Sequence, residues 1–317
     1  MKKLGIFLFI ITAALLNLSC ENILNPNAPF RERYALTGIM RSDTTLQVVT
    51  LTRSYEPADG FNPLTNTQDP AITGAEVNIW YKDTLYELRD TTLVRQDTTH
   101  YKDSVHCYYV KNLMPQENEY VDIEALLPNG LLLQSTTKLP DVNPYSFFDF
   151  SNDKVIPPTD KDYISVRWDT LANTIYSPRI NIVYYVQGST EKKEWQVPLY
   201  YISDNGKSVP VYPNQTKINF VNISMETITR ALNEISPGDA DKSKYSIAEM
   251  DVELVVYDES LSTYYLSIQG GLDAFTVKLD MPDYSNIQGG YGVFGSYVRT
   301  VYKLKFTNNY LKSLGYQ

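Results

Sequence analysis

Residues 120–137 read YVDIEALLPNGLLLQSTT. Two apolar-rich runs flank the turn residues Pro128, Asn129 and Gly130. An Asn-Gly pair between two such runs favours a tight hairpin, because Asn and Gly tolerate the left-handed backbone that the turn requires. This stretch therefore predicts two antiparallel strands joined by a short turn.

Segments with a two-residue apolar period continue upstream of this hairpin. Such alternation places every second side chain on the same face of a strand. Together with the hairpin, these segments predict roughly seven or eight short strands, which is typical of an immunoglobulin-like sandwich over residues 34–140. The strands predicted for this domain are 35–40, 47–52, 76–81, 84–88, 104–110, 120–127 and 131–137.

A boundary at 140–144, with a proline at each end, leads into a second β-rich domain over residues 145–317. In this domain Ser224 can cap a helix that runs to Ile235, and a second short helix is expected at 260–268. The strands predicted here are 163–168, 179–186, 194–202, 217–223, 248–257 and 297–306. The chain is therefore predicted to be mostly β, with a sandwich followed by a β-rich domain that contains one or two short helices.

Composition and charge narrow the classes of function. The chain has 43% hydrophobic and 21% charged residues, a balance that allows a buried core, and its 26 tyrosines favour β-structure. The formal charge is −9, and loss of Lys2 and Lys3 with the leader would make it −11, because 26 basic and 37 acidic residues remain. Nucleic-acid binding depends on clustered Lys and Arg, so we expect no nucleic-acid partner.

The first twenty residues predict the cellular address. Two lysines precede an almost unbroken apolar run at 4–16, which is too short and wrongly flanked for a spanning helix. Residues 1–19 are therefore predicted to be a signal peptide, with Cys20 as the site of lipid attachment to a membrane. Residues 20–33 contain Pro26 and Pro29 and are expected to form a spacer after the anchor.

Only one cysteine remains if Cys20 carries lipid. Cys107 lies in the strand-like run 105–110, so we expect a buried and unreactive thiol. No intrachain disulfide is then possible, and a chain of this length does not need one.

Two features of the sequence suggest surfaces for a ligand or partner. The segment 55–74 has no strand period, and loops of this length are either binding loops or disordered; Tyr55 and Phe61 are its candidate contact residues. Aromatic residues also occur in adjacent pairs, such as Trp80-Tyr81. Neighbours on a strand point to opposite faces, so each such pair gives one ring to the core and one to the exterior.

Motifs for metal or nucleotide chemistry are weak. His100 and His106 have no third ligand at a matching spacing, and 239–250 lacks the glycine and glutamate of a calcium loop. The segment 290–295 fits Gly-x-Gly-x-x-Gly, but a polar segment precedes it and a strand pattern follows it, so we predict a glycine-rich crossing against a neighbouring strand. We predict no catalytic residue, metal or cofactor.

Three segments carry a family resemblance. VTLTRS at 49–54, ITGAEV at 72–77 and SNIQGGYGVFGSY at 285–297 resemble an uncharacterised family of Bacteroidetes-type lipoproteins, a domain of unknown function. In that family an Asn-Ile-x-x-Gly-x-Gly-x-Phe-Gly stretch lies near the C-terminus. The resemblance implies an outer-membrane lipoprotein that works beside a TonB-dependent transporter in nutrient capture.

These observations lead to a functional expectation with two alternatives. We expect a lipid-anchored, non-enzymatic binding or accessory protein of the outer membrane, on the cell surface rather than the periplasmic face. Its partners would be the membrane, a TonB-dependent transporter and a glycan or peptide ligand. The alternatives are a surface hydrolase of glycans or peptides, whose two carboxylates the sequence does not identify, and an adhesion or assembly module.

Overall fold

The structure is a computed structural model of the full chain. The chain divides into one unit of residues Met1–Glu32 and a second unit of residues Arg33–Gln317, and the fold described below belongs to the second. The structure describes residues 30–54, 70–95, 104–142, 155–159, 161–239, 241–269 and 284–316.

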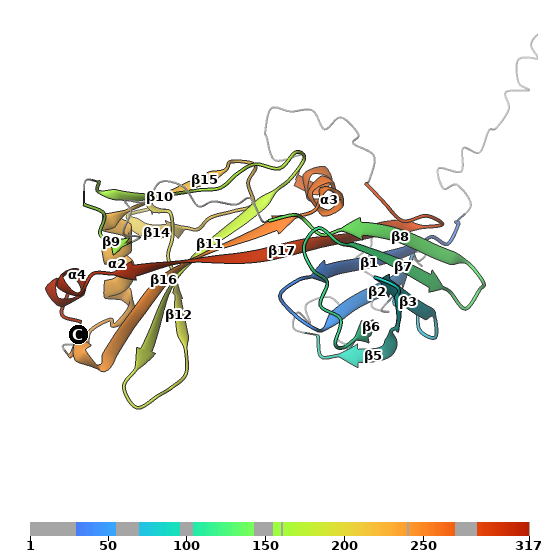
Figure 1. The fold of residues 1–317 in the computed structure, drawn as a ribbon, viewed down its shortest axis with the longest axis horizontal. Coiled ribbons are helices and arrows are strands. Elements are labelled where there is room, and N and C mark those ends of the chain that lie inside the picture. The colour runs from blue at the N-terminus through green and yellow to red at the C-terminus, as the bar shows by residue number, and fades with distance from the viewer. Residues whose placement is uncertain are drawn as a thin grey trace, which may run out of the picture. The chain divides into compact units, whose positions relative to one another are not determined.

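The fold is mostly β, as predicted, with several sheets and three α-helices among the described residues (Figure 1). The first half contains β1 (Tyr34–Arg41), β2 (Gln47–Arg53), β3 (Glu76–Tyr81), β4 (Thr84–Glu87), β5 (Arg89–Leu93), β6 (Val105–Val110), β7 (Tyr120–Leu126) and β8 (Leu132–Lys138). Every strand predicted for this half is present, and β5 is an additional one.

The second half contains the longest strands and all the described helices. Its strands are β9 (Val155–Ile156), β10 (Tyr163–Arg167), β11 (Tyr176–Val186), β12 (Lys193–Gln196), β13 (Tyr200–Asp204), β14 (Lys207–Val211), β15 (Phe220–Ser224), β16 (Tyr245–Tyr257) and β17 (Tyr291–Phe306). Its helices are α2 (Met225–Ile235), the short 3-10 helix η2 (Lys242–Lys244), α3 (Glu259–Gln269) and α4 (Asn308–Ser313).

Helix α2 begins and ends where the sequence predicted. The Ser224 side chain accepts a hydrogen bond from the backbone N–H of Thr227, which satisfies one of the free donors at the helix start. The single strand predicted at 194–202 is instead two strands, β12 and β13. Pro198 lies between them, and proline has no N–H to donate to a sheet.

The hairpin predicted over residues 120–137 is present and belongs to a four-stranded sheet. β7 and β8 pair antiparallel across the predicted turn, where Gly130 has a φ of 85°. The sheet order is β4-β3-β7-β8. Along β7 the side chains of Val121, Ile123 and Ala125 are buried, while those between them point away from the core. This alternation gives the sheet one buried face and one outward face.

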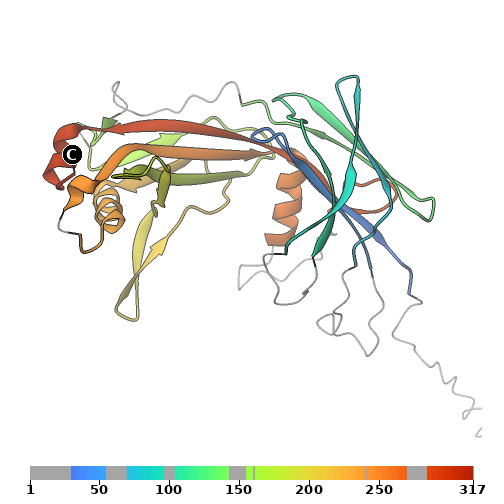
Figure 2. The ribbon, with the colours of Figure 1, turned by 90° about the horizontal axis from the view of Figure 1, so that it is seen from below.

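A nine-stranded sheet contains strands from both halves of the chain. Its main order is β12-β11-β16-β17-β1-β2-β6-β5, and β9 pairs with β17 beside this path. The first part of β17 pairs parallel with β1, from Ala35↔Tyr291 to Arg41↔Tyr297. Its second part pairs antiparallel with β16. β17 is therefore the strand that joins the two halves, and the red strand of Figure 2 continues beyond the end of its neighbour β16.

This pairing changes the predicted organisation in one respect. The sequence placed a complete sandwich within residues 34–140 and started the last strand at Tyr297. The strand begins at Tyr291 instead, and the added residues pair with β1 of the sandwich. Residues 34–140 therefore do not complete this sheet alone. The pairing partners lie more than 250 residues apart in the sequence, and local patterns carry no information about such contacts.

The glycine-rich segment before and within β17 makes the close crossing that the sequence predicted. A Cβ on Gly290 would lie 2.7 Å from the carbonyl oxygen of Tyr34, and one on Gly292 would lie 2.1 Å from that of Leu36. No helix follows these glycines, which continue directly into a strand. Close backbone approach, and not phosphate binding, accounts for these glycines.

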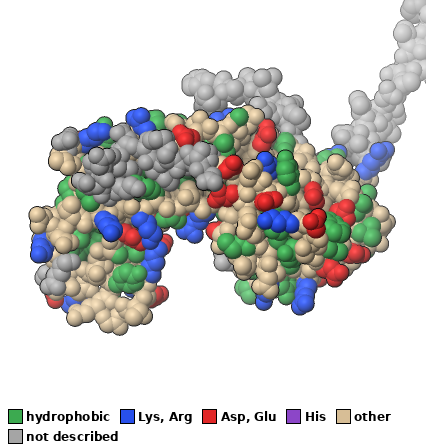
Figure 3. Space-filling model, viewed as in Figure 1, with side chains coloured by type: hydrophobic (Ala, Val, Ile, Leu, Met, Phe, Trp, Pro, Cys, Tyr) green, Lys and Arg blue, Asp and Glu red, His purple; other side chains and the backbone are tan. Residues whose placement is uncertain are grey.

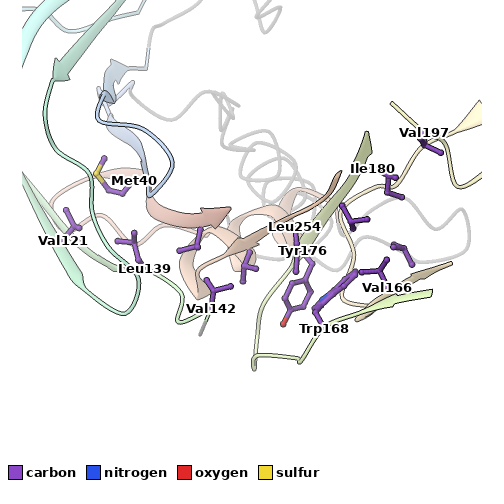
Figure 4. Close-up of a cluster of buried hydrophobic side chains, with 14 of the residues drawn as sticks. Met40, Val121, Leu139, Val142, Val166, Trp168, Tyr176, Ile180, Val197 and Leu254 are labelled. Atoms are coloured by element: carbon purple, nitrogen blue, oxygen red, sulfur yellow. The ribbon is translucent and has the colours of Figure 1, made fainter. Parts of the chain in front are cut away.

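The buried apolar side chains form one continuous cluster across both halves. Met40, Val121 and Leu139 of the first half belong to the same cluster as Trp168 and Tyr176 of the second (Figure 4). The rings of Trp168 and Tyr176 lie 5.6 Å apart at an angle of 55°. A tilted ring contact of this kind adds to the stabilisation from burial.

Replacing Gly292 by alanine tests the close crossing. Gly292 has a φ of +106°, and its Cβ would overlap the Leu36 carbonyl, so we expect Gly292→Ala to lower the free energy of unfolding by more than about 2 kcal/mol. Gly188→Ala is the matched control, because Gly188 also has a positive φ, of +82°, but no atom within 4 Å of the added Cβ. Urea unfolding of the full-length variants measures both; equal losses would contradict the close-crossing argument.

Candidate functional site

The outward face of the four-stranded sheet carries large exposed apolar side chains. Trp80 on β3 is 43% exposed and Tyr120 on β7 is 59% exposed. Tyr81, the neighbour of Trp80, is buried, as predicted for an aromatic pair on a strand. We call this the outward face, and it comprises Glu76, Asn78, Trp80, Leu85, Glu87, Tyr120, Asp122, Glu124, Leu126, Leu132, Gln134, Thr136 and Lys138.

Carboxylates lie between these apolar side chains. The strand register places Trp80, Asp122 and Thr136 in one row across the sheet. The Thr136 hydroxyl donates to Asp122 Oδ1 at 2.5 Å, and in the next row Gln134 Nε2 donates to Glu124 Oε1 at 2.7 Å. Each carboxylate is therefore held by the neighbouring strand, and acidic and apolar side chains are seen close together over this part of the chain (Figure 3).

A first pocket of about 530 Å³ lies over this face. It is bounded on one side by Asn286 and Gln288, from the segment before β17. Two sets of hydrogen bonds hold that segment against β8: the backbones of Gln134 and Gln288 pair in both directions, and the Ser135 hydroxyl donates to the Asn286 carbonyl at 2.8 Å. The Asn286 side chain also pairs with both backbone groups of Phe294. The glycine-rich crossing thus forms one side of the pocket.

A second pocket of about 450 Å³ adjoins the first, because Thr136 lines both. Tyr120 extends into it from the outward face, and Tyr257 and Glu259 contribute from the end of β16 and the start of α3. Both volumes fall within the usual range for small-molecule sites. The lining is rich in aromatic rings, carboxylates, amides and hydroxyls, with Lys138 its only Lys or Arg among the described residues.

Asp258 lies at the base of the second pocket and is almost fully buried. Its carboxylate accepts hydrogen bonds from the Thr137 hydroxyl at 2.6 Å and from the backbone N–H of Leu261 at 2.8 Å. Burial raises the pKa of Asp258 despite these bonds. The backbone N–H of Asp258 donates to the Ser296 carbonyl on β17 at 2.9 Å. Asp258 therefore fixes the start of α3 to β8 and β17, which is a structural task.

The stability of the protein should depend on pH through Asp258. As the pH rises above the ordinary value of 3.8, the unfolded chain loses this proton first, so the free energy of unfolding falls until the folded carboxyl also ionises. The side chain of Asp258→Asn cannot ionise, so the free energy of unfolding of this variant should fall less over the same pH range. Urea unfolding of both proteins across this pH range measures the difference between their free energies of unfolding. The contributions of the other carboxylates are the same in both proteins and cancel in this difference.

Asp258→Ala separates the hydrogen bonds from the charge. It leaves the Leu261 N–H without its partner and the Thr137 hydroxyl with only Ser296 Oγ at 3.0 Å, so we expect the free energy of unfolding to fall by about 1–3 kcal/mol at every pH. A difference between wild type and Asp258→Asn that does not change with pH would contradict the raised pKa.

The structure does not test the site residues that were predicted from the sequence. Cys20, Tyr55 and Phe61 are outside the described residues. The outward face was missed as a site, although the Trp80-Tyr81 pair signalled one outward ring. The additional signal was the period-two placement of Asp122 and Glu124 on β7, the strand that pairs with β3. The sequence prediction of this strand considered only its apolar positions.

The remaining cysteine is buried, as predicted. Cys107 is 1% exposed on β6, and burial raises the pKa of its thiol.

Among the described residues no helix has the length and apolar character needed to cross a membrane. His106 lies beside Asp90, with Nδ1 3.1 Å from Oδ1.

Comparison with known proteins adds no assignment. No protein-family model matches the chain. A search of curated proteins likewise finds no significant match. The site residues and the predicted signal peptide are therefore the basis for inferring a function.

Proposed function

We propose that this chain is a lipid-anchored, non-enzymatic binding protein of the outer membrane, and that the outward face recognises its ligand. The observation that carries this proposal is the exposure of Trp80, Tyr120 and their apolar neighbours on one face of a sheet whose opposite face is buried along β3, β7 and β8. Contiguous exposed apolar side chains bordered by polar ones are typical of binding surfaces. The two adjoining pockets lie on or beside this face.

The charge of the face limits the ligand class. Four carboxylates, Glu76, Glu87, Asp122 and Glu124, share the face with a single cation, Lys138, whose Nζ lies 5.3 Å from the centre of the Tyr120 ring. Carboxylates repel polyanions and accept hydrogen bonds from neutral or cationic groups. The ligand that fits best is therefore neutral or positively charged.

The predicted leader and the family resemblance support a location at the outer membrane for this binding protein. Acyl chains on Cys20 would hold the mature chain at the membrane, and the spacer 20–33 would separate the folded unit from it. The resemblance of the segment 285–297 implies a role beside a TonB-dependent transporter in nutrient capture. We favour the cell surface, where a ligand can be captured before transport.

A surface hydrolase is the second candidate function. Asp122 and Glu124 are two residues apart on β7 and therefore lie on the same face of the sheet, and glycosidases use a pair of carboxylates for their chemistry. Both carboxylates already accept a hydrogen bond from β8 and lie on a sheet face, and this favours binding over turnover. Release of reducing ends from oligosaccharides by the purified protein, lost in Asp122→Asn, would favour the hydrolase.

The lipid anchor predicts a labelling result. Cells supplied with radiolabelled palmitate should incorporate the label into the wild-type protein and not into Cys20→Ala. Cys107→Ala is the matched control, because it removes the only other cysteine and should keep the label. Equal labelling of wild type and Cys20→Ala, or no labelling of either, would refute the anchor.

The transporter partnership predicts co-purification. Affinity purification of the anchored protein from detergent-solubilised outer membranes should recover a TonB-dependent transporter in comparable amount, identified by mass spectrometry. The Cys20→Ala protein, which would not reach the membrane by its anchor, is the control. Repeated recovery of the anchored protein alone would contradict the accessory role.

A further inference from the structure

The two pockets of the candidate site form one extended groove. Thr136 lines both, and Tyr120 connects the outward face with the second pocket. The groove extends from Asn286 and Gln288, past the outward face, to Glu259 at the start of α3. We call it the β8 groove, because residues 134–138 of β8 line it throughout. Its lining residues, spread over two adjoining pockets, suit a ligand made of several linked units.

Two aromatic residues of the groove, Trp80 and Tyr120, are neighbours on the outward face. Trp80 is directly opposite Asp122, and Tyr120 lies two residues before Asp122 on the same face. Diagonal neighbours of this kind have backbones about 7–8 Å apart. Both rings are substantially exposed and supply apolar surfaces at low entropic cost. Two adjacent flat apolar surfaces are thus available at the centre of the groove.

Polar groups around these rings match a ligand rich in hydroxyls. The carboxylates of Asp122 and Glu124 are strong acceptors, and a carboxylate oxygen can accept more than one hydrogen bond. The Gln134 and Gln288 amides can both donate and accept, as can the Thr136 hydroxyl. A sugar ring presents apolar C–H faces with hydroxyls around its edge, so stacking and edge hydrogen bonding are satisfied together.

We infer that the β8 groove binds a neutral oligosaccharide, stacked on Trp80 and Tyr120 and hydrogen-bonded through Asp122 and Glu124. This inference rests on the proposed function and specifies its ligand class. An acidic glycan is disfavoured because the carboxylates of the outward face would repel its negative charges. A peptide that adds a strand needs an open sheet edge, and at Gln134 the edge of β8 is already paired with Gln288.

Binding measurements with defined sugars test the inference. Full-length protein in detergent is titrated calorimetrically with neutral hexasaccharides of glucose, xylose and mannose, and with a neutral and a lysine-rich hexapeptide. At least one hexasaccharide should bind, and Trp80→Ala should weaken that binding by about tenfold or more, as expected for loss of a central aromatic contact. Trp80→Phe keeps a ring and should retain part of the affinity.

Two further variants make the test specific to the groove. Tyr200→Ala is the matched control, because Tyr200 is a 53% exposed aromatic residue on the separate β13–β14 hairpin, and its affinity should equal that of wild type. Glu259→Ala changes the far end of the groove, so it should weaken binding of the hexasaccharide but not of the corresponding disaccharide. Circular dichroism verifies that each variant is folded.

The outcomes separate this inference from the function on which it rests. Absence of hexasaccharide binding by folded wild-type protein, or equal affinity of Trp80→Ala and wild type, would overturn the saccharide inference. If a hexapeptide binds instead and Trp80→Ala abolishes that binding, the inference fails while the outward face remains the recognition surface. The lipid anchor and the transporter partnership are tested independently by labelling and co-purification.

Discussion

The first part of β17 lies parallel to β1, so close that Gly292 has no space for a side chain beside the Leu36 carbonyl. Parallel strands of one chain require a long crossover, and here almost the whole chain forms it. Each further contact between the halves follows from this pairing. In the described sheet β16 pairs with β11 and β17 and with no strand of the first half, and the buried cluster is continuous across both halves.

The same constraint builds the candidate site. The segment that leads into β17 pairs with β8 at Gln134, and this pairing places Asn286 and Gln288 beside the outward face. Asp258 holds α3 against β8 and β17 at the other end. Residues from all three thirds of the chain thus line one groove. The Asn-Ile-x-x-Gly-x-Gly-x-Phe-Gly stretch has a structural explanation: Gly290 and Gly292 allow the close approach to β1, and Gly295 allows the close approach of Leu261 on α3.

The chemistry of the groove follows from a sheet with only one buried face. Because side chains alternate along β7, Val121 and Ile123 are buried while Asp122 and Glu124 lie on the outward face. Hydrogen bonds from Thr136 and Gln134 orient these two carboxylates. Hydrogen bonds along the rows of the sheet organise these carboxylates without burying them, so they remain available as acceptors. Exposed rings between them add apolar contact, which supports a binding surface for a polar, uncharged ligand.

The sequence by itself determined the local elements and the expected cellular address. Most strands and α2 could be predicted from local signals, because these depend only on neighbouring residues. The signals were the hairpin residues 128–130, the Ser224 cap and the two-residue apolar period. Only the tertiary structure decided that β17 begins at Tyr291 and pairs with β1, and that Trp80, Asp122 and Gln288 share one groove. These contacts join residues far apart in the chain, and their free energy comes from packing and pairing that no local pattern records.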